Sequence, residues 1–194
     1  MNDLPFIQFS GWAAVINGLT SIASTVTLML MFAVASFFGP VNDAISVIWC
    51  LSFIPLALLF YRLNQPVNPS LSLAAVVIGI IAMIIFAVAQ MMLVLGIVTF
   101  EQSLGVVLSM GAVTGFWALI NGWLARGGGT LPGAMTWLLI IFGASYMLTA
   151  VGWYMAGQEN PLVMIGFLIG AVAGPIWAIW LGRLLLVADF ATSL

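Results

Sequence analysis

The chain has 194 residues, of which 64% are hydrophobic and only 4% are charged, and its mean hydropathy is +1.29. So few polar residues cannot cover the surface of a water-soluble domain of this size. The composition therefore excludes a soluble domain and predicts an integral membrane protein.

Six stretches of the chain are long and apolar enough to cross a bilayer, whose core of about 30 Å needs about 20 mostly apolar residues per helix. Their apolar runs are continuous and do not alternate with polar residues, which indicates helices and not the strands of a barrel. In chain order the predicted spans are residues 11–38, 44–61, 71–99, 104–124, 135–155 and 161–187. The predicted fold is an all-α integral membrane protein, in which residues 1–194 form one six-helix transmembrane bundle with short loops.

The first predicted span carries a polar stripe formed by Asn17, Ser21, Ser24 and Thr25. Their intervals of three and four residues place them on one helical face, which should lie against protein or water and not against lipid. Two explanations stay open at this point. The stripe either forms hydrogen bonds between helices or lines a path for a ligand.

The third and fourth predicted spans add three polar candidates: Gln90, Thr114 and Asn121. An unpaired amide within hydrocarbon costs several kcal/mol, so Gln90 should find either a partner on another helix or a bound polar group. We expect Thr114 and Asn121 to be able to meet the polar stripe of the first span, as could Ser145 and Thr149 on the fifth.

The last predicted span has small residues at every fourth position, namely Gly166, Gly170, Gly174, Ala178 and Gly182. This spacing keeps them on one helical face and predicts close packing against another transmembrane helix. The pattern leaves open whether that helix belongs to this chain, to a second copy or to a different subunit.

The charged residues divide between the two sides that six crossings define. Arg62 and Arg126 follow the second and fourth spans, and Arg183 lies near the end of the sixth. The acidic residues Asp43, Glu101 and Glu159 lie in the opposite loops. Positive charge near span ends marks the cytoplasmic face, so both termini should be cytoplasmic. The segment 175–183 resembles the ends of small bacterial multispan proteins, which implies a bacterial inner (cytoplasmic) membrane but no activity.

Several chemistries lack their residues in this chain. It contains no histidine, and its basic residues are all arginine, so histidine-ligated haem or zinc, a Ser-His site and a lysine Schiff base are excluded. The run Arg126-Gly127-Gly128-Gly129-Thr130 lacks the Lys-Ser/Thr of a phosphate-binding loop, which indicates a connector. We expect no catalytic residues, no metal, no cofactor and no enzyme activity.

Two functions remain as hypotheses. The first is a non-catalytic accessory or scaffolding subunit of a membrane assembly, which could bind lipid, quinone or pigment. The second is a small transporter or channel for a neutral or apolar solute, because such passage needs only hydroxyls and amides. The expected partners are the lipid bilayer and either other transmembrane subunits or further copies of the chain. Nucleic acid is excluded, because the chain has no basic patch.

Overall fold

The computed structural model describes residues 4–187, and within that range every regular element is an α-helix. The helices are α1 Leu4–Ala33, α2 Phe38–Asn64, α3 Pro69–Val94, α4 Phe100–Gly128, α5 Gly133–Ala156 and α6 Pro161–Leu186. All six are long and apolar enough to cross a membrane. The prediction of six apolar helices is confirmed, and it indicates a multipass membrane protein.

Local capping chemistry decides where the helices begin. Asn68 precedes Pro69 at the start of α3, and its side chain accepts a hydrogen bond from the Leu71 N–H. Asn160 precedes Pro161 at the start of α6 and accepts from Leu162 in the same way. Proline suits the first helical position because its missing N–H would have no partner there, and asparagine satisfies an N–H that the helix leaves free.

The helix bounds differ from the predicted spans at several ends. α1 begins at Leu4, before the predicted start, and stops at Ala33, so that Phe38 is already the first residue of α2. The glycine run expected as a connector begins inside α4, which ends where Gly129 takes the left-handed φ of 64°. Hydropathy marks the bilayer core, whereas caps and turns determine where a helix ends.

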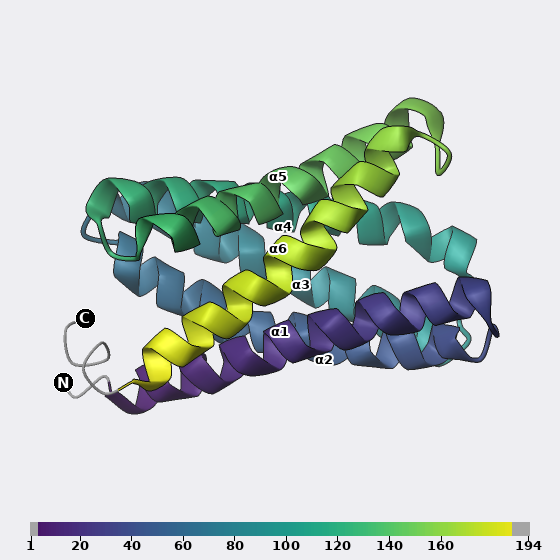
Figure 1. Cartoon of the computed structure of the whole chain (residues 1–194), viewed down its shortest axis with the longest axis horizontal. Helices are drawn as coiled ribbons and strands as arrows, with labels where there is room; N and C mark the ends of the chain where they lie inside the picture. The colour runs from purple at the N-terminus through teal and green to yellow at the C-terminus, as the bar shows by residue number, and fades with distance from the viewer. Residues whose placement is uncertain (1–3, 188–194) are drawn as a thin grey trace.

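The helices form a closed ring. Each packs against the next in the chain, and α6 also packs against α1. Figure 1 shows that α6 crosses the bundle diagonally, with its first half beside α5 and its second half beside α1. The alternating directions gather Arg62, Arg126 and Arg183 at one end, here called the arginine end, and Asp43, Glu101 and Glu159 at the other, here called the acidic end.

The two ends of the small-residue ridge on α6 lie against two different helices. A side chain at Gly166 would place its Cβ 2.6 Å from the Ser145 carbonyl oxygen on α5. A side chain at Gly182 would lie 2.8 Å from the Gly11 carbonyl oxygen and 3.0 Å from the Val15 nitrogen on α1. Only glycine permits backbones to approach this closely.

Between these ends the ridge faces side chains. Gly170 lies beside the Ser145 hydroxyl and the Tyr146 ring, and Gly174 lies beside the Phe142 ring, all on α5. Ala178 is fully buried. Since all five ridge residues are buried, and the partners at the four glycines are helices of this chain, the ridge presents no open seam to another subunit.

Aromatic side chains fill the interior of the ring toward the arginine end. This cluster, here called the aromatic plug, consists of Phe53, Phe60, Trp117, Phe142 and Trp177. Trp117 meets Phe53 and Phe60 edge-to-face, at ring-centroid distances of 4.5 and 5.4 Å, and Phe142 stacks on Trp177 at 6.3 Å. Such pairs bury large apolar areas and lock the geometry of the helices that carry them.

Replacing Gly166 by alanine should lower the free energy of unfolding by about 1–3 kcal/mol, because the new Cβ meets α5 backbone that cannot move aside. The matched control is Gly105→Ala, since Gly105 lies within α4 with nothing inside 4 Å of its Cβ position. That change should stabilise the helix by about 0.5–1 kcal/mol. Thermal unfolding of the detergent-solubilised variants measures both, and equal shifts would contradict the packing of α6 on α5.

Candidate functional site

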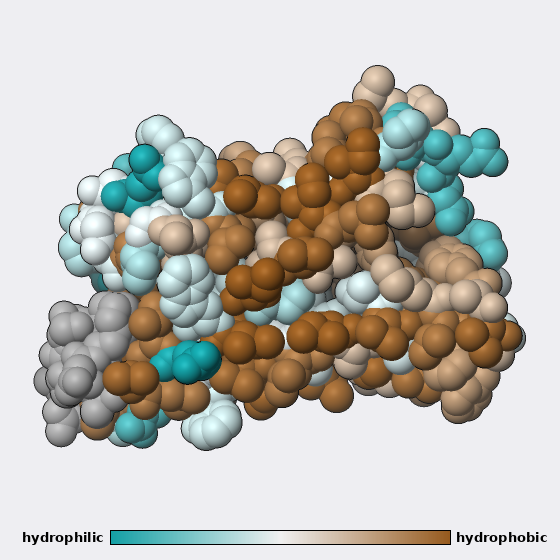
Figure 2. All heavy atoms as spheres, viewed as in Figure 1, coloured by the Kyte–Doolittle hydropathy of each residue, from teal (hydrophilic) through white to brown (hydrophobic). Residues whose placement is uncertain are grey.

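A cavity of about 720 Å³ occupies the acidic half of the ring and is lined by residues from all six helices. Its size falls within the range of about 300–1,000 Å³ that is common for small-molecule sites. Figure 2 shows paler, less hydrophobic side chains in the hollow between α1 and α6, framed by strongly hydrophobic ones. The cavity reaches the acidic end, where Phe32, Phe100 and Gln158 line it.

The diagonal course of α6 creates this cavity. A side chain at Gly174 would lie 3.9 Å from the Ser21 hydroxyl, so the two helices are still close there. Farther toward the acidic end, Thr25 and Leu28 of α1 and Leu168 of α6 line the cavity instead. The helices that touch at the arginine end thus enclose an open space at the other.

The wall between α1 and α2 is polar. The Ser24 hydroxyl donates to the Asn42 side-chain oxygen at 2.7 Å and lies 3.1 Å from the Ser46 hydroxyl. The Thr27 hydroxyl also approaches the Asn42 oxygen, at 3.4 Å. Ser24, Asn42 and Ser46 all line the cavity, so this network gives it a wall of hydroxyl and amide groups.

The predicted stripe on α1 divides between two roles. Ser21, Ser24 and Thr25 line the cavity. Asn17 does not; its amide donates to the Trp49 carbonyl at 3.0 Å and to the Ser52 hydroxyl at 3.1 Å, both on α2. Asn17 therefore joins two helices, while the rest of the stripe faces the cavity.

Gln90 on α3 is the exceptional polar group of the cavity wall. Its side chain is only 5% exposed, and its Oε1 atom has no hydrogen-bond partner among the described residues. The assignment of oxygen and nitrogen in an amide can be exchanged, but either orientation leaves a buried polar atom without a partner. Seven buried side-chain atoms among the described residues lack a partner, and Gln90 Oε1 is the one whose residue lines the cavity, which makes Gln90 the candidate contact for a bound molecule.

Three aromatic residues form the floor of the cavity. Trp49 stacks on Tyr146 at a centroid distance of 6.3 Å and meets Phe86 edge-to-face at 5.7 Å. All three line the cavity, and Tyr146 also contacts Phe142 of the aromatic plug at 4.8 Å. Stacked rings therefore separate the cavity from the arginine end.

Thr114 and Asn121 do not line the cavity, and their hydrogen bonds do not reach the α1 stripe. The Thr114 hydroxyl donates to the Met110 carbonyl of its own helix at 2.8 Å. Asn121 accepts from the Asn64 amide of α2 at 2.9 Å and donates to the Trp117 carbonyl at 2.9 Å. Asn121 thus holds α4 against α2 within the core.

Three polar cavity residues on α2, namely Asn42, Asp43 and Ser46, were not among the sequence candidates. Asn42 and Asp43 precede the predicted span, whereas α2 already begins at Phe38. The spacing of four between Asn42 and Ser46 was the available signal, because it places both on one helical face. Knowledge that this face meets α1 requires the structure.

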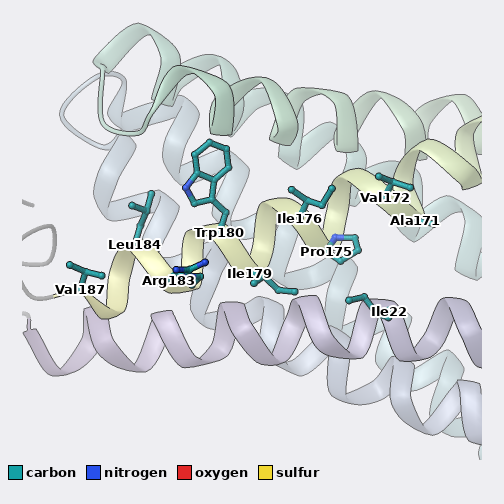
Figure 3. Close-up of a pocket in the computed structure, with 10 residues that line it drawn as sticks. All are labelled: Ile22, Ala171, Val172, Pro175, Ile176, Ile179, Trp180, Arg183, Leu184 and Val187. Carbon is teal, nitrogen blue, oxygen red and sulfur yellow. The ribbon is translucent and has the colours of Figure 1, made fainter.

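A second hollow, of about 690 Å³, lies on the outside of the bundle along α6. Figure 3 shows Ile22 of α1 near Pro175 of α6, with Ile179 and Arg183 farther along α6 toward Val187. Its lining is apolar except near Arg183, and none of its residues carries a buried polar side chain without a partner. The inner cavity, with Gln90, is therefore the stronger candidate site.

Within residues 4–187, no group of three or more histidine, cysteine, aspartate or glutamate residues could hold a metal ion. Compared with protein-family models, curated protein sequences and solved structures, the chain matches none of them. Function is therefore inferred from the cavity and its residues.

Gln90→Leu should raise the free energy of unfolding of the ligand-free protein by about 1 kcal/mol, because it removes a buried amide that lacks a partner. The matched control, Asn121→Leu, makes the same chemical change where the amide is paired, and it should lower stability by about 0.6–1.7 kcal/mol. Thermal unfolding in lipid nanodiscs without added ligand measures both shifts. A loss of stability in Gln90→Leu would mean that this amide has a partner in the protein.

Proposed function

We propose that this chain is a non-catalytic membrane protein that binds one small amphipathic organic molecule in the cavity at its acidic end. The observation that carries the proposal is the cavity, whose volume suits such a molecule and whose wall includes the buried Gln90 amide with its unpaired oxygen. A hydrogen-bond donor on the ligand would satisfy this atom.

The distribution of polar groups supports an amphipathic ligand. Polar side chains gather on the α1–α2 wall and at Gln90, while Leu28, Leu93, Leu108 and Val163 contribute apolar lining elsewhere. Sites with a few polar groups in a mostly apolar lining bind molecules that have a polar head and an apolar body. Lipids belong to this class, and so do quinols, the reduced quinones whose hydroxyl groups can donate.

An accessory or scaffolding role has less support. Its strongest argument from the sequence was the small-residue ridge, which could have packed against a foreign subunit. Gly166 and Gly182 instead lie against α5 and α1 of the same chain. The accessory role then depends on the short loops and the lack of a catalytic set, and it stays a prediction.

A carrier for a neutral or apolar solute is the second candidate, and the one-sided form of the cavity favours it. The cavity reaches the acidic end at Phe32 and Phe100, whereas the aromatic plug fills the ring toward the arginine end. A carrier holds its site open to one side while the other side is closed. The same arrangement suits a protein that binds its ligand and never releases it on the other side.

We place the chain in a bacterial inner membrane with the arginine end in the cytoplasm, because positive residues near span ends favour that side. The cavity then opens to the outer face. The assignment to the inner membrane and the orientation are both independent of the identity of the ligand.

Protein in lipid nanodiscs should bind 1-dodecanol saturably, measured by titration calorimetry after subtraction of empty nanodiscs. Gln90→Leu should weaken binding about three- to tenfold, the equivalent of one hydrogen bond. Asn121→Leu should bind as the native chain does, because Asn121 does not line the cavity. Absence of saturable binding would overturn the proposed function, and unchanged binding by Gln90→Leu would remove Gln90 from the site.

The orientation is tested with single cysteines in a Cys50→Ala background, because Cys50 is the only cysteine and is buried. Leu104→Cys lies in the cavity lining, and Gly127→Cys lies in the last turn of α4 at the arginine end. In intact spheroplasts a membrane-impermeant maleimide should label the first and not the second. The reverse pattern would contradict the orientation.

The same reagent separates a carrier from a fixed binding protein. Ala57 is fully buried in the core of the arginine half of the ring. In inside-out vesicles supplied with 1-dodecanol, Ala57→Cys should become reactive if the protein alternates between two open sides. It should stay unreactive if the plug never opens.

A further inference from the structure

Among the described residues that line the cavity, Asp43 is the only one with a formal charge at neutral pH. It lies in the second turn of α2, beside Asn42 of the polar wall, and is partly buried. From its place in the cavity, and resting on the proposed function, we infer that the ligand is an organic ammonium ion: a protonated primary or secondary amine attached to an apolar body.

Among the described residues, no cationic side chain lies near Asp43. The chain has no lysine or histidine, and its three basic residues are arginines. All three lie at the arginine end; Arg62, on the same helix, is about 28 Å away at 1.5 Å per residue. A partly buried carboxylate without a counter-charge is costly, and a bound ammonium group would supply that charge.

The electrostatic field at the mouth of the cavity also favours a cation. Glu101 is exposed in the first turn of α4, and Glu159 is exposed in the α5–α6 connection, both at the acidic end. No basic residue in the described part of the chain lies at this end. Clefts lined by charge of one sign concentrate ligands of the opposite sign, so this mouth attracts cations and repels anions.

Hydrogen bonding at Asp43 also favours a donor on the ligand. An ionised carboxylate can only accept hydrogen bonds, and Asp43, which is hydrogen-bonded to the Asn42 side chain, has capacity to accept more. The head of the ligand must therefore donate. Primary and secondary ammonium groups donate hydrogen bonds and carry positive charge, whereas carboxylates and phosphates carry negative charge and act as acceptors.

The aromatic lining fits the same ligand. Trp49 and Tyr146 form the floor, and Phe100 and Trp153 line the cavity toward the acidic end. The faces of aromatic rings attract ammonium groups and also pack against apolar chains. One lining thus accommodates both parts of an alkylammonium ion.

The test compares three probes with the same chain and different heads: dodecylammonium, 1-dodecanol and dodecanoate. Each is titrated into nanodiscs of a zwitterionic lipid that contain the protein, with empty nanodiscs subtracted. Dodecylammonium should bind about tenfold or more tightly than 1-dodecanol, as a charge pair in a partly buried site implies, and dodecanoate should bind weakest. Equal affinity for the ammonium and the alcohol overturns the inference and leaves the proposed function standing, whereas failure of all three probes overturns both.

Variants then assign the preference to Asp43. Asp43→Asn should remove the difference between dodecylammonium and 1-dodecanol while binding of the alcohol persists, and Asp43→Glu should keep the preference. The matched control is Glu101→Gln, which removes one carboxylate at the same end of the bundle from a residue outside the cavity lining. This variant should keep most of the preference for dodecylammonium over 1-dodecanol. A preference that survives in Asp43→Asn overturns the assignment. The comparison of probes on the native chain stays decisive if that variant does not fold.

Discussion

Close backbone contact between α6 and two different helices is the constraint on which the rest of the structure depends. A bilayer gives helices no hydrophobic reason to associate, so van der Waals contact, together with a few hydrogen bonds between helices, must hold the ring together. At Gly166 that contact is with α5, and at Gly182 it is with α1. A helix that must touch both neighbours at opposite ends has to cross the ring diagonally. The space between α1 and α6 at the acidic end follows directly from this course.

The buried amides of this bundle differ in their hydrogen bonds and in their distance from the cavity. Asn17 and Asn121 donate their amides across or along helices, so their polar groups cost little in an apolar interior. Gln90 is buried to a similar degree, yet its oxygen lacks a partner. The Asn64 Oδ1 atom in the core also lacks a partner, so Gln90 differs from the other buried amides in that it lines the interior cavity. Binding sites often carry this kind of local cost.

Much of the fold could be predicted from the sequence, because transfer of apolar residues into a bilayer depends on composition and length alone. The polarity of Ser21, Ser24 and Gln90 was also visible, since polar residues are rare in these spans. Their meeting in one cavity was not, because it depends on which helices are neighbours and at what angle they cross. Asp43 illustrates the limit: in the sequence it belongs to a loop, and only the early start of α2 brings it into the wall.

The glycine contacts also determine how this chain can evolve. Positions 166 and 182 admit no side chain, so substitutions there are removed by selection whatever the ligand is. The outward positions of α6, such as Ile165, Ile169 and Val172, are exposed and can exchange freely among apolar residues. Drift of this kind erodes overall identity while leaving the four-residue spacing of small residues intact. Distant relatives should therefore be recognisable by that spacing, together with an acidic residue early in the second helix, long after pairwise similarity has faded.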